Sequence, residues 1–344
     1  MTQCSCEGIG ALLIAIGAAS CLRGAEGAQE PHPRTLTARC GDLQVLFRDN
    51  SRSPALLSGI GSLVNFRAAK GYDAIDPEGK GASAGLNFEH IICGSRNPNN
   101  KFTPRSGPYL LYPLPGQSGA RLVRSGTDGP WNVSSTLEYH VVAPNAVDFQ
   151  FRCTPHRADL FGPHGYAIFF FADYMNDVAD IALHFRGVAA PGDPETWIAA
   201  HAPRGHPDWN GGGTYRHRDA PPLEYDRDLD FRLNSWSYDW PRYTEPFYFG
   251  RAAQGMTFIL MFDRWYTPED EIRFSLFKFK LSRHPRPAWD FQYVVHRVVA
   301  EREYGFRGRL VWKKFQSADD CRAEYHNWKA TLRAGPRPRP NSAH

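Results

Sequence analysis

The sequence predicts an all-β protein, a large antiparallel sandwich of two sheets that is followed by one C-terminal α-helix. Apolar residues alternate with polar ones far more often than they recur at helical spacing. The 31 Gly and 27 Pro residues are spread along the chain, and strands do not alternate with helical stretches of about 10 to 15 residues, as they would in a parallel α/β fold. With 344 residues, 42% hydrophobic and 13% aromatic, the chain can bury a substantial core.

The first 28 residues are typical of an export signal. Residues 10–22 form an apolar run that has the length of a signal-peptide core and is too short to span a bilayer. Small residues precede Gln29, so we expect cleavage near Ala28. Alternatively, Ala18-Ala19-Ser20-Cys21 resembles a lipoprotein box, and Cys21 would then carry a lipid anchor, the protein's one contact with a membrane. Both interpretations predict an exported protein of the periplasm or cell surface, with a polar linker at 29–34.

We expect one sandwich domain over residues 35–333, built from two kinds of strand. Half-buried strands, in which apolar and polar residues alternate, are expected at 136–142, 145–155, 289–295 and 306–312. Continuous apolar runs at 165–171 and 257–262 are typical of central strands that are covered on both faces. The irregular stretch from Ala202 to Pro222, which is centred on Gly211-Gly212-Gly213, is expected to be a long loop.

One amphipathic helix is expected, from Ala318 to Arg333. Ser317 can cap its N-terminus, and two aspartates in the first turn suit the positive end of the helix dipole. Its apolar stripe should pack on the sandwich and consists of Cys321, Tyr325, Trp328 and Leu332. Gly335 ends the helix, and residues 334–344 read as a disordered tail rich in Pro and Arg.

Charge and cysteine usage exclude several classes of function. The net charge of +4 is too small for a nucleic-acid-binding protein. The basic residues are 32 Arg and 8 Lys, which fits either codon bias or recognition of an acidic ligand. Four cysteines follow the leader, at positions 40, 93, 153 and 321, without a C-x-x-C pair, so a zinc knuckle or a thioredoxin motif is excluded. We expect no cofactor.

Five segments resemble a family of exported, largely uncharacterised bacterial proteins. They are Gly85 to His90, Pro130-Trp131-Asn132-Val133, Asp148 to His156, Tyr243 to Arg251 and Pro287 to Tyr293. Such proteins are similar in length and all-β pattern to the large β-sandwich of galactose-mutarotase-like and polysaccharide-lyase-like proteins. The resemblance therefore implies a carbohydrate-active protein on a galactose-mutarotase-like fold.

Aldose epimerases of that fold carry their working groups in the chain order Arg, His, His, Asp, Glu. The corresponding order in this chain would be Arg67, His90, His164, Asp239 and Glu301. The segments around the two histidines do not match those of an epimerase, so a mutarotase is retained only as a second alternative.

The candidate catalytic residues are Glu245, His90 and Asp290. If 243–251 is one strand, Glu245 and Arg251 share an aromatic face, either as groups that grip a ligand or as members of structural ion pairs. Strand parity places Asn87 and Glu89 on one face and His90 on the other. Asp290 lies between two aromatic residues, which could raise its pKa and make it a general acid.

Further residues are expected to bind the substrate. They are Arg251, Asn87, Arg67, Asp263, Arg273, Tyr293 and Trp289. Asp263 and Arg273 flank the aromatic pair Trp265-Tyr266, and aromatic rings beside polar groups are typical of sugar sites. A metal site could be drawn from His201, His206, Asp208 and His217, but their spacing matches no metal motif, and we expect none.

The sequence therefore predicts an exported protein that acts on or binds a polysaccharide or oligosaccharide. A lyase or glycoside hydrolase of an acidic glycan is preferred. A lyase would use a Tyr or His together with an Arg that neutralises a uronate, and a hydrolase would use two carboxylates. The alternative from another class is a non-catalytic envelope or surface protein that uses the same sandwich for carbohydrate binding or assembly.

Overall fold

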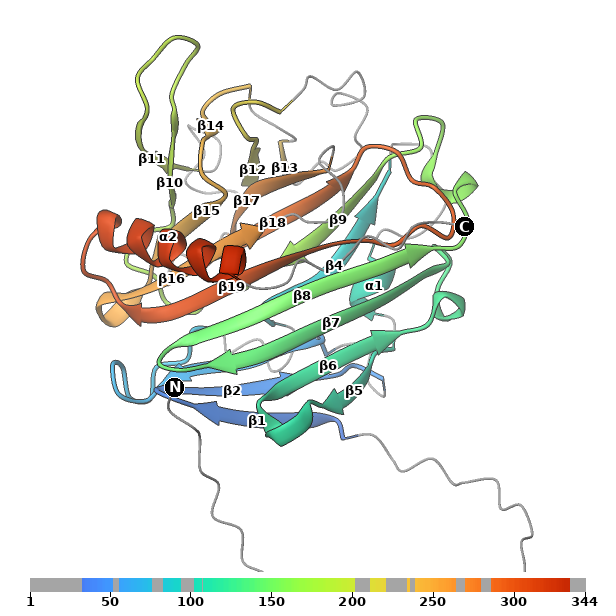
Figure 1. Cartoon of the computed structure of the whole chain (residues 1–344), viewed down its shortest axis with the longest axis horizontal. Coiled ribbons are helices and arrows are strands. Elements are labelled where there is room, and N and C mark those ends of the chain that lie inside the picture. The colour runs from blue at the N-terminus through green and yellow to red at the C-terminus, as the bar shows by residue number, and fades with distance from the viewer. Residues whose placement is uncertain are drawn as a thin grey trace, which may run out of the picture.

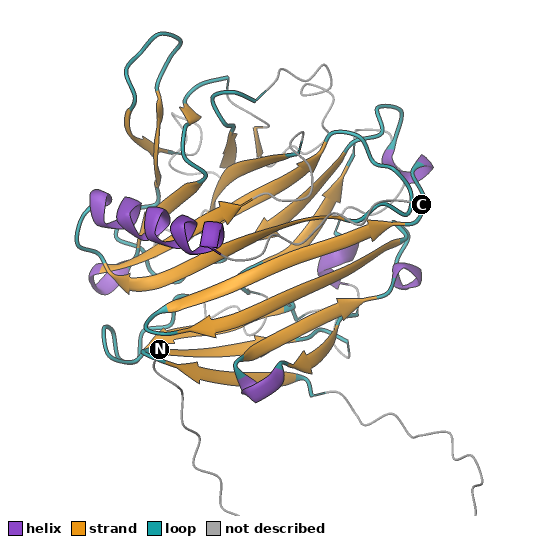
Figure 2. Cartoon of the chain, in the orientation of Figure 1, coloured by secondary structure: helices purple, strands orange, loops and turns teal. Residues whose placement is uncertain are grey.

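The computed structural model describes most of the chain as antiparallel strands in two layers (Figures 1 and 2). The described residues are 33–51, 56–75, 83–93, 102–106, 108–201, 211–220, 234–235, 239–263, 270–279 and 286–334. The leader with Cys21, the C-terminal tail, His206, Asp208 and the pair Trp265-Tyr266 lie outside these ranges.

The first layer is a ten-stranded sheet. In spatial order its strands are β11 (Thr196–Ala200), β10 (Leu183–Val188), β15 (Phe247–Arg251), β16 (Met256–Asp263), β19 (Tyr304–Lys314), β8 (Ala146–Pro155), β7 (Val133–Val142), β6 (Gly119–Arg124) and β5 (Leu110–Pro113), while β14 (Arg242–Tyr243) pairs with β10. β16 lies between two other strands and is buried on both faces, which confirms the interpretation of its continuous apolar run.

The second layer contains a six-stranded and a three-stranded sheet. The six-stranded order is β13 (Asn234–Ser235), β12 (Gly211–Tyr215), β17 (Glu271–Phe279), β18 (Arg286–Val295), β9 (Ala167–Ala172) and β4 (Asn87–Ile92). The smaller sheet contains β1 (Thr35–Cys40), β2 (Leu43–Arg48) and β3 (Gly59–Asn65). It continues the layer beside β4, because Ile60 and Gly85 exchange two backbone hydrogen bonds of 2.8 Å.

The core between the layers is largely aromatic. Phe171 of β9 stacks on Phe291 of β18 with ring centroids 4.8 Å apart, and Phe306 of β19 meets both rings edge-on from the opposite layer. Edge-to-face and offset ring pairs are favourable beyond the area that they bury. The two-layer antiparallel sandwich predicted from residue alternation is thus confirmed.

Helices contribute little to the described part of the chain. α1 (Thr103–Ser106) lies beside β4, and short 3₁₀ turns occur at η2 (Pro115–Gln117), η3 (Gly126–Asp128), η4 (Asp159–Phe161) and η5 (Ala253–Gly255). α2 (Ala318–Ala334) lies across β16 on the outer face of the ten-stranded sheet (Figure 1). Among the described residues, we find no helix with the length and apolarity needed to cross a membrane.

The predicted apolar stripe of the C-terminal helix is confirmed. Cys321, Tyr325 and Trp328 are buried in a cluster with Phe247 and Ile259 of the sheet, and Leu332 packs against this cluster. Ser317 caps the helix, since its Oγ accepts a 3.0 Å hydrogen bond from the backbone N–H of Asp320. Within the described chain, Cys40, Cys93, Cys153 and Cys321 are not joined by disulfides.

Four local expectations were wrong. The segment 289–295, expected to be a half-buried strand, is buried on both faces within β18. The Gly211–Gly213 triplet is not loop but begins β12, which pairs with β17. Residues 243–251 do not form one strand, because a bend at 244–246 separates β14 from β15. A bulge at Glu89 shifts the register of β4, so that Asn87 pairs with Ala172 and His90 pairs with Phe170. Asn87 and His90 therefore lie on the same face of the sheet, against the simple parity rule.

Candidate functional site

The outer face of the six-stranded sheet carries two rows of buried side chains, most of them polar, and we call it the polar face. One row runs across the strands through His90, Phe170, Gln292 and Arg273, and the next through Asn87, Ala172, Asp290, Ser275 and Thr214. All of these residues are buried. Buried polar side chains are uncommon unless they are paired or needed for function, so this face is the candidate functional site.

Several polar atoms on this face have no hydrogen-bond partner within the described ranges. They are both amide atoms of Gln292, the Oγ of Ser275, the Oγ1 of Thr214 and the Oδ1 of Asn87. Leaving a buried polar group unsatisfied costs about 1 to 3 kcal/mol. The five atoms are therefore unused hydrogen-bonding groups within the buried polar face.

A proton-carrying cluster lies at the β4 end of the polar face. The Tyr174 hydroxyl donates to Oε1 of Glu89 at 2.5 Å, and Nη1 of Arg105 donates to the same oxygen at 2.8 Å. The Glu89 side chain is 3% exposed, whereas that of Arg105 is 34% exposed and Tyr174 is half-buried. Glu89 is therefore the buried member of this cluster, and Tyr174 and Arg105 are its partly exposed members.

Two further buried carboxyl groups adjoin this cluster. Oδ1 of Asp290 accepts from the backbone N–H of Asp173 at 2.9 Å, and Oδ1 of Asp173 accepts from the N–H of Leu86 at 2.7 Å. Burial raises the pKa of Asp173 to about 7. Burial, together with the nearby charges of Glu89 and Asp173, raises the pKa of Asp290 well above its usual value.

Burial also raises the pKa of Glu89, against the opposing effects of Arg105 and the Tyr174 hydrogen bond. The same cause raises the pKa of Tyr174 well above its usual value. The cluster therefore holds carboxyl groups that keep protons at higher pH than ordinary acids, which is a common property of catalytic sites.

The far end of the polar face is a buried ion network. Nε of Arg216 donates to Oε1 of Glu271 at 2.8 Å, Nη2 of Arg273 donates to Oε2 at 3.2 Å, and Nε2 of His296 lies 3.6 Å from Oε2. Although burial opposes ionisation, Arg273, His296 and Arg216 together hold the pKa of Glu271 well below its usual range. Arg273 is thus committed to a carboxylate of the sheet.

The structure separates Glu245 from the other two candidate catalytic residues. Glu245 lies in the bend before β15 and pairs with helix α2, with its Oε2 2.9 Å from Nε of Arg322 and its Oε1 3.2 Å from Nε2 of His326. His90 and Asp290 lie on the polar face, which is the opposite outer face of the sandwich. The ring of His90 contacts those of Phe102 and Phe170, with centroids 4.3 and 5.0 Å away.

The remaining substrate-binding candidates divide between the two layers. Asn87 and Arg273 lie on the polar face, where Nδ2 of Asn87 donates to the carbonyl of Ser58 at 2.8 Å. Trp289 and Tyr293 instead face the core, where their polar atoms are used in hydrogen bonds to Ile181 and Asp270.

Three charged candidates lie outside the polar face. Asp263 accepts from Arg307 and from Lys329 of α2. Arg251 is exposed, with its guanidinium 5.1 Å from the centroid of the Phe315 ring. Arg67 is 75% exposed and pairs with Asp42 at 3.2 Å.

The residues that follow the epimerase order do not form a common site. His90 is buried on the polar face, Arg67, His164 and Asp239 are exposed, and Glu301 contacts His156. The described residues also contain no group of three or more His, Cys, Asp or Glu side chains that could hold a metal.

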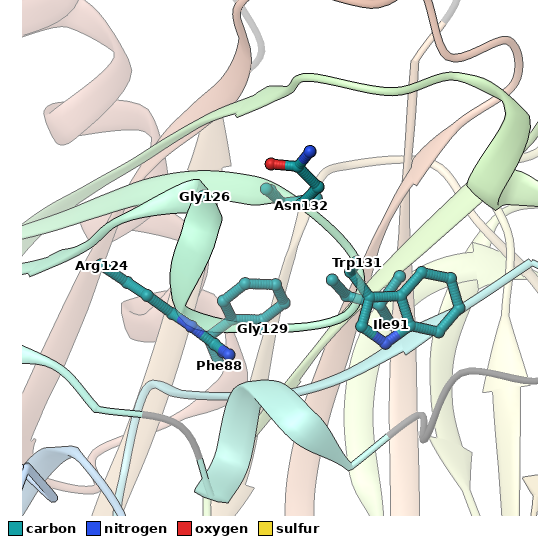
Figure 3. A pocket seen from close by; sticks show the side chains of 8 residues that line it. Phe88, Ile91, Arg124, Gly126, Gly129, Trp131 and Asn132 are labelled. Carbon is teal, nitrogen blue, oxygen red and sulfur yellow. The ribbon is translucent and has the colours of Figure 1, made fainter.

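Neither of two cavities in the described part of the chain is lined by Glu89, Tyr174 or Arg105. One of about 10 Å³ is lined by Phe88, Ile91, Arg124, Trp131 and neighbouring residues (Figure 3) and has room for about one water molecule. The second, of about 210 Å³, lies between the layers near α2 and is lined by His217, Tyr243, Pro246, Phe262, Asp263, Ile272 and Lys329. Asp263 is the one residue in the lining of the second cavity that the sequence analysis predicts as a site residue.

Sequence reasoning missed the most accessible members of the cluster. Tyr174 lies two residues after the end of the buried strand β9, and polar residues just after such a strand are a signal that could have been used. Gln292 lies two residues after Asp290 and could have been found by the same alternation. No local pattern marks Arg105, which reaches Glu89 from another segment of the chain.

The sequence matches no family model and no curated protein. Among solved structures, the chain is similar to a galactose mutarotase related enzyme from Lactobacillus acidophilus, with a TM-score of 0.47 and 8% identity over 81% of this chain and 97% of that chain. It is also similar to a mutant of a heparan sulfate lyase from Pedobacter heparinus, with a TM-score of 0.41 and 6% identity over 85% of this chain and 39% of that chain. At sequence identities this low, no residue role can be carried over from these proteins. The site is therefore assigned from the contacts within this chain.

Proposed function

We propose that the protein binds an acidic polysaccharide on the polar face and cleaves it by elimination, as a lyase. The observation that carries this proposal is the convergence of the Tyr174 hydroxyl and the Arg105 guanidinium on one oxygen of the buried Glu89. A proton-transfer group and a cation that can face a uronate carboxylate are thereby held within one cluster.

The chemistry of elimination matches the parts of this cluster. A lyase removes the proton from the carbon next to the uronate carboxylate, and the C–H electron pair forms a C=C bond as the C–O bond to the leaving sugar breaks. Tyr174 takes that proton on its oxygen while its own proton passes to Glu89. It then returns a proton to the leaving oxygen. The raised pKa of Glu89 makes it a better proton acceptor than an ordinary carboxylate.

Arg105 supplies the positive charge that the uronate carboxylate requires. Its guanidinium is partly exposed, whereas Arg273 is fully buried and bound to Glu271. A planar guanidinium can bind a carboxylate through two parallel hydrogen bonds. Neutralising the uronate carboxylate stabilises the negative charge that develops when the proton leaves the neighbouring carbon.

A second candidate function is binding of the same glycan without cleavage. It is favoured by atoms of Gln292, Ser275 and Thr214 that have no hydrogen-bond partner among the described residues, since these atoms provide hydrogen-bonding groups but no acid or base. With either function, we still expect the mature protein to be exported, since acidic polysaccharides are polymers of cell envelopes and extracellular material.

A panel of uronate and neutral polysaccharides separates these candidates. We expect ultraviolet absorbance from an unsaturated uronate product, together with new reducing ends, on at least one uronate polymer and on no neutral one. New reducing ends without that absorbance would indicate hydrolysis instead. Binding measured by calorimetry without either signal would support the non-catalytic candidate, and the absence of binding and of both signals would contradict the proposal.

A further inference from the structure

Ser134, His156 and Glu301 form a chain of hydrogen bonds on the outer face of the ten-stranded sheet, in the layer opposite the polar face. The Oγ of Ser134 lies 2.6 Å from Nε2 of His156, and Nδ1 of the same ring lies 3.0 and 3.1 Å from the two carboxylate oxygens of Glu301. A hydroxyl, an imidazole and a carboxylate in this order have the geometry of an activated nucleophile.

The surrounding donors determine where the protons lie. The backbone N–H of Gly126 donates to Oγ of Ser134 at 3.0 Å, so the serine is the acceptor in that bond and its own proton is available to His156. An ionised Glu301 can only accept, so Nδ1 of His156 carries a proton and Nε2 is left as the acceptor. The hydrogen bonds thus define the tautomer in which His156 can act as a base toward Ser134.

Backbone contacts hold all three residues in place. Ser134 is paired with Thr154 in the β7–β8 ladder, the N–H of His156 donates to the carbonyl of Asn132 at 2.9 Å, and the N–H of Glu301 donates to the carbonyl of Pro155 at 2.8 Å. Asn132 and Glu301 both have left-handed backbone conformations, with φ of 49° and 61°. Such conformations cost about 1 to 3 kcal/mol and cluster at functional sites.

The chain of hydrogen bonds is open to solvent at the histidine and the glutamate. Their side chains are 31% and 70% exposed, and Ser134 is half-buried. Gly126 borders the site, since a Cβ at that position would lie 2.4 Å from the His156 ring and 3.1 Å from Oγ of Ser134. The glycine therefore leaves the space that Ser134 needs beside His156.

We propose that Ser134 is the nucleophile of an acyl-transfer site that cleaves esters of short carboxylic acids. The adjoining cavity of about 10 Å³ has room for about one water molecule and for no acyl chain, so the acyl group is short and both parts of the ester lie on the open surface. The site is independent of the polar face and of the lyase proposed above.

The reaction follows from the proton positions. Oγ of Ser134 bonds to the ester carbonyl carbon as its proton moves to Nε2 of His156, and the alcohol leaves with that proton when the C–O bond breaks. Water then repeats the step on the acyl serine and releases the carboxylic acid. Glu301 is a positioning residue that keeps the ring oriented. Because the Gly126 N–H donates to the nucleophilic Oγ itself, no donor to the oxyanion is identified among the described residues, and we expect slow turnover.

Covalent labelling of the full chain with a fluorophosphonate, followed by peptide mass mapping, tests the nucleophile without any substitution. We expect the adduct on Ser134 and slow hydrolysis of p-nitrophenyl acetate. The exposed Ser118, whose hydroxyl donates to a backbone carbonyl, serves as the matched control, and Ser118→Ala should label as the parent protein does. An adduct absent from Ser134 in the folded protein would overturn the proposal.

Substitutions of the other two residues separate a catalytic arrangement from a structural one. His156→Gln should lower the labelling rate constant about 100-fold or more, as expected for loss of a general base. Glu301→Gln should lower it at least about tenfold, and Glu301→Asp should restore part of it, with the melting temperature unchanged in both. Labelling of Ser134 that is undiminished in His156→Gln would contradict the assignment, whatever the outcome of the polysaccharide panel.

Discussion

The Tyr174 hydroxyl donates a 2.5 Å hydrogen bond to Oε1 of Glu89, a residue 85 positions earlier in the chain. β4 carries the glutamate, and the tyrosine follows the neighbouring strand β9, so the sheet itself sets their distance. In the proposed lyase, this bond is the path by which the tyrosine proton leaves.

Tyr174→Phe should therefore lower uronate-polymer cleavage about 100-fold or more, the usual size of a lost proton-transfer group. The half-buried ring keeps its packing, so we expect a melting temperature within a few degrees of the parent protein. Tyr112→Phe, in β5 of the other layer, is the matched control and should retain full activity. The assay is product absorbance on the polymer that the panel identifies, and full activity in Tyr174→Phe would remove this residue from the mechanism.

The raised pKa of Asp173 predicts a pH dependence of stability. A carboxyl group whose pKa is higher in the folded than in the unfolded chain binds its proton more tightly when folded. Its contribution therefore favours folding below the unfolded value near 3.8 and is lost as the pH rises toward about 7. The loss is on the order of 4 kcal/mol over that interval, and the raised pKa values of Asp290 and Glu89 act in the same direction.

Asp173→Asn should flatten this dependence, because the amide does not ionise and its Oδ1 can still accept from Leu86. Urea unfolding at pH 5 and pH 7.5 measures the change. If the parent and the variant lose the same free energy of unfolding between these pH values, Asp173 is not the group responsible.

Most of the fold was predictable because alternation and helical spacing are local signals. The stripe from Cys321 to Leu332 and the buried strand β16 lie where the sequence placed them. The bulge at Glu89 and the bend at 244–246 were not predictable, since a one-residue insertion changes which side chains share a face without changing their order. Sequence reasoning named His90 and Asp290 as catalytic candidates, and both lie on the polar face. It could not identify Arg105, because the contact of Arg105 with Glu89 depends on the tertiary fold.

Glu245→Gln should leave activity unchanged and lower stability by about 1 kcal/mol or less. The carboxylate, whose side chain is 16% exposed, pairs with Arg322 and His326 of helix α2, whose side chains are 39% and 53% exposed, and ion pairs with exposed partners contribute little. A thermal melt beside the polysaccharide assay checks both expectations. Loss of activity with an unchanged melt would instead return Glu245 to the list of catalytic residues.

Trp328→Ala should destabilise the protein by about 3 to 5 kcal/mol, because the indole is buried between α2 and the ten-stranded sheet. The exposed Lys314 provides a control outside this contact, and Lys314→Ala should change the free energy of unfolding by less than about 0.5 kcal/mol. Denaturant unfolding measures both. An unchanged midpoint in Trp328→Ala would show that the helix is peripheral to the cooperative fold.

The last prediction concerns Gln292, whose two amide atoms are buried without partners in the described part of the chain. If the polar face is only structural, Gln292→Leu removes an unsatisfied group and should raise the free energy of unfolding by about 1 kcal/mol, with no other consequence. If the face binds a glycan, the same substitution should still stabilise the fold but should weaken binding at least about tenfold, since one ligand hydrogen bond of about 1.5 kcal/mol is lost. Thr136→Val, on the outer face of the other layer, is the control and should not affect binding. Calorimetric titration of each variant with the polymer found in the panel, beside urea unfolding, measures both quantities. A more stable Gln292→Leu protein that binds with parental affinity would remove the row of His90, Phe170, Gln292 and Arg273 from the site.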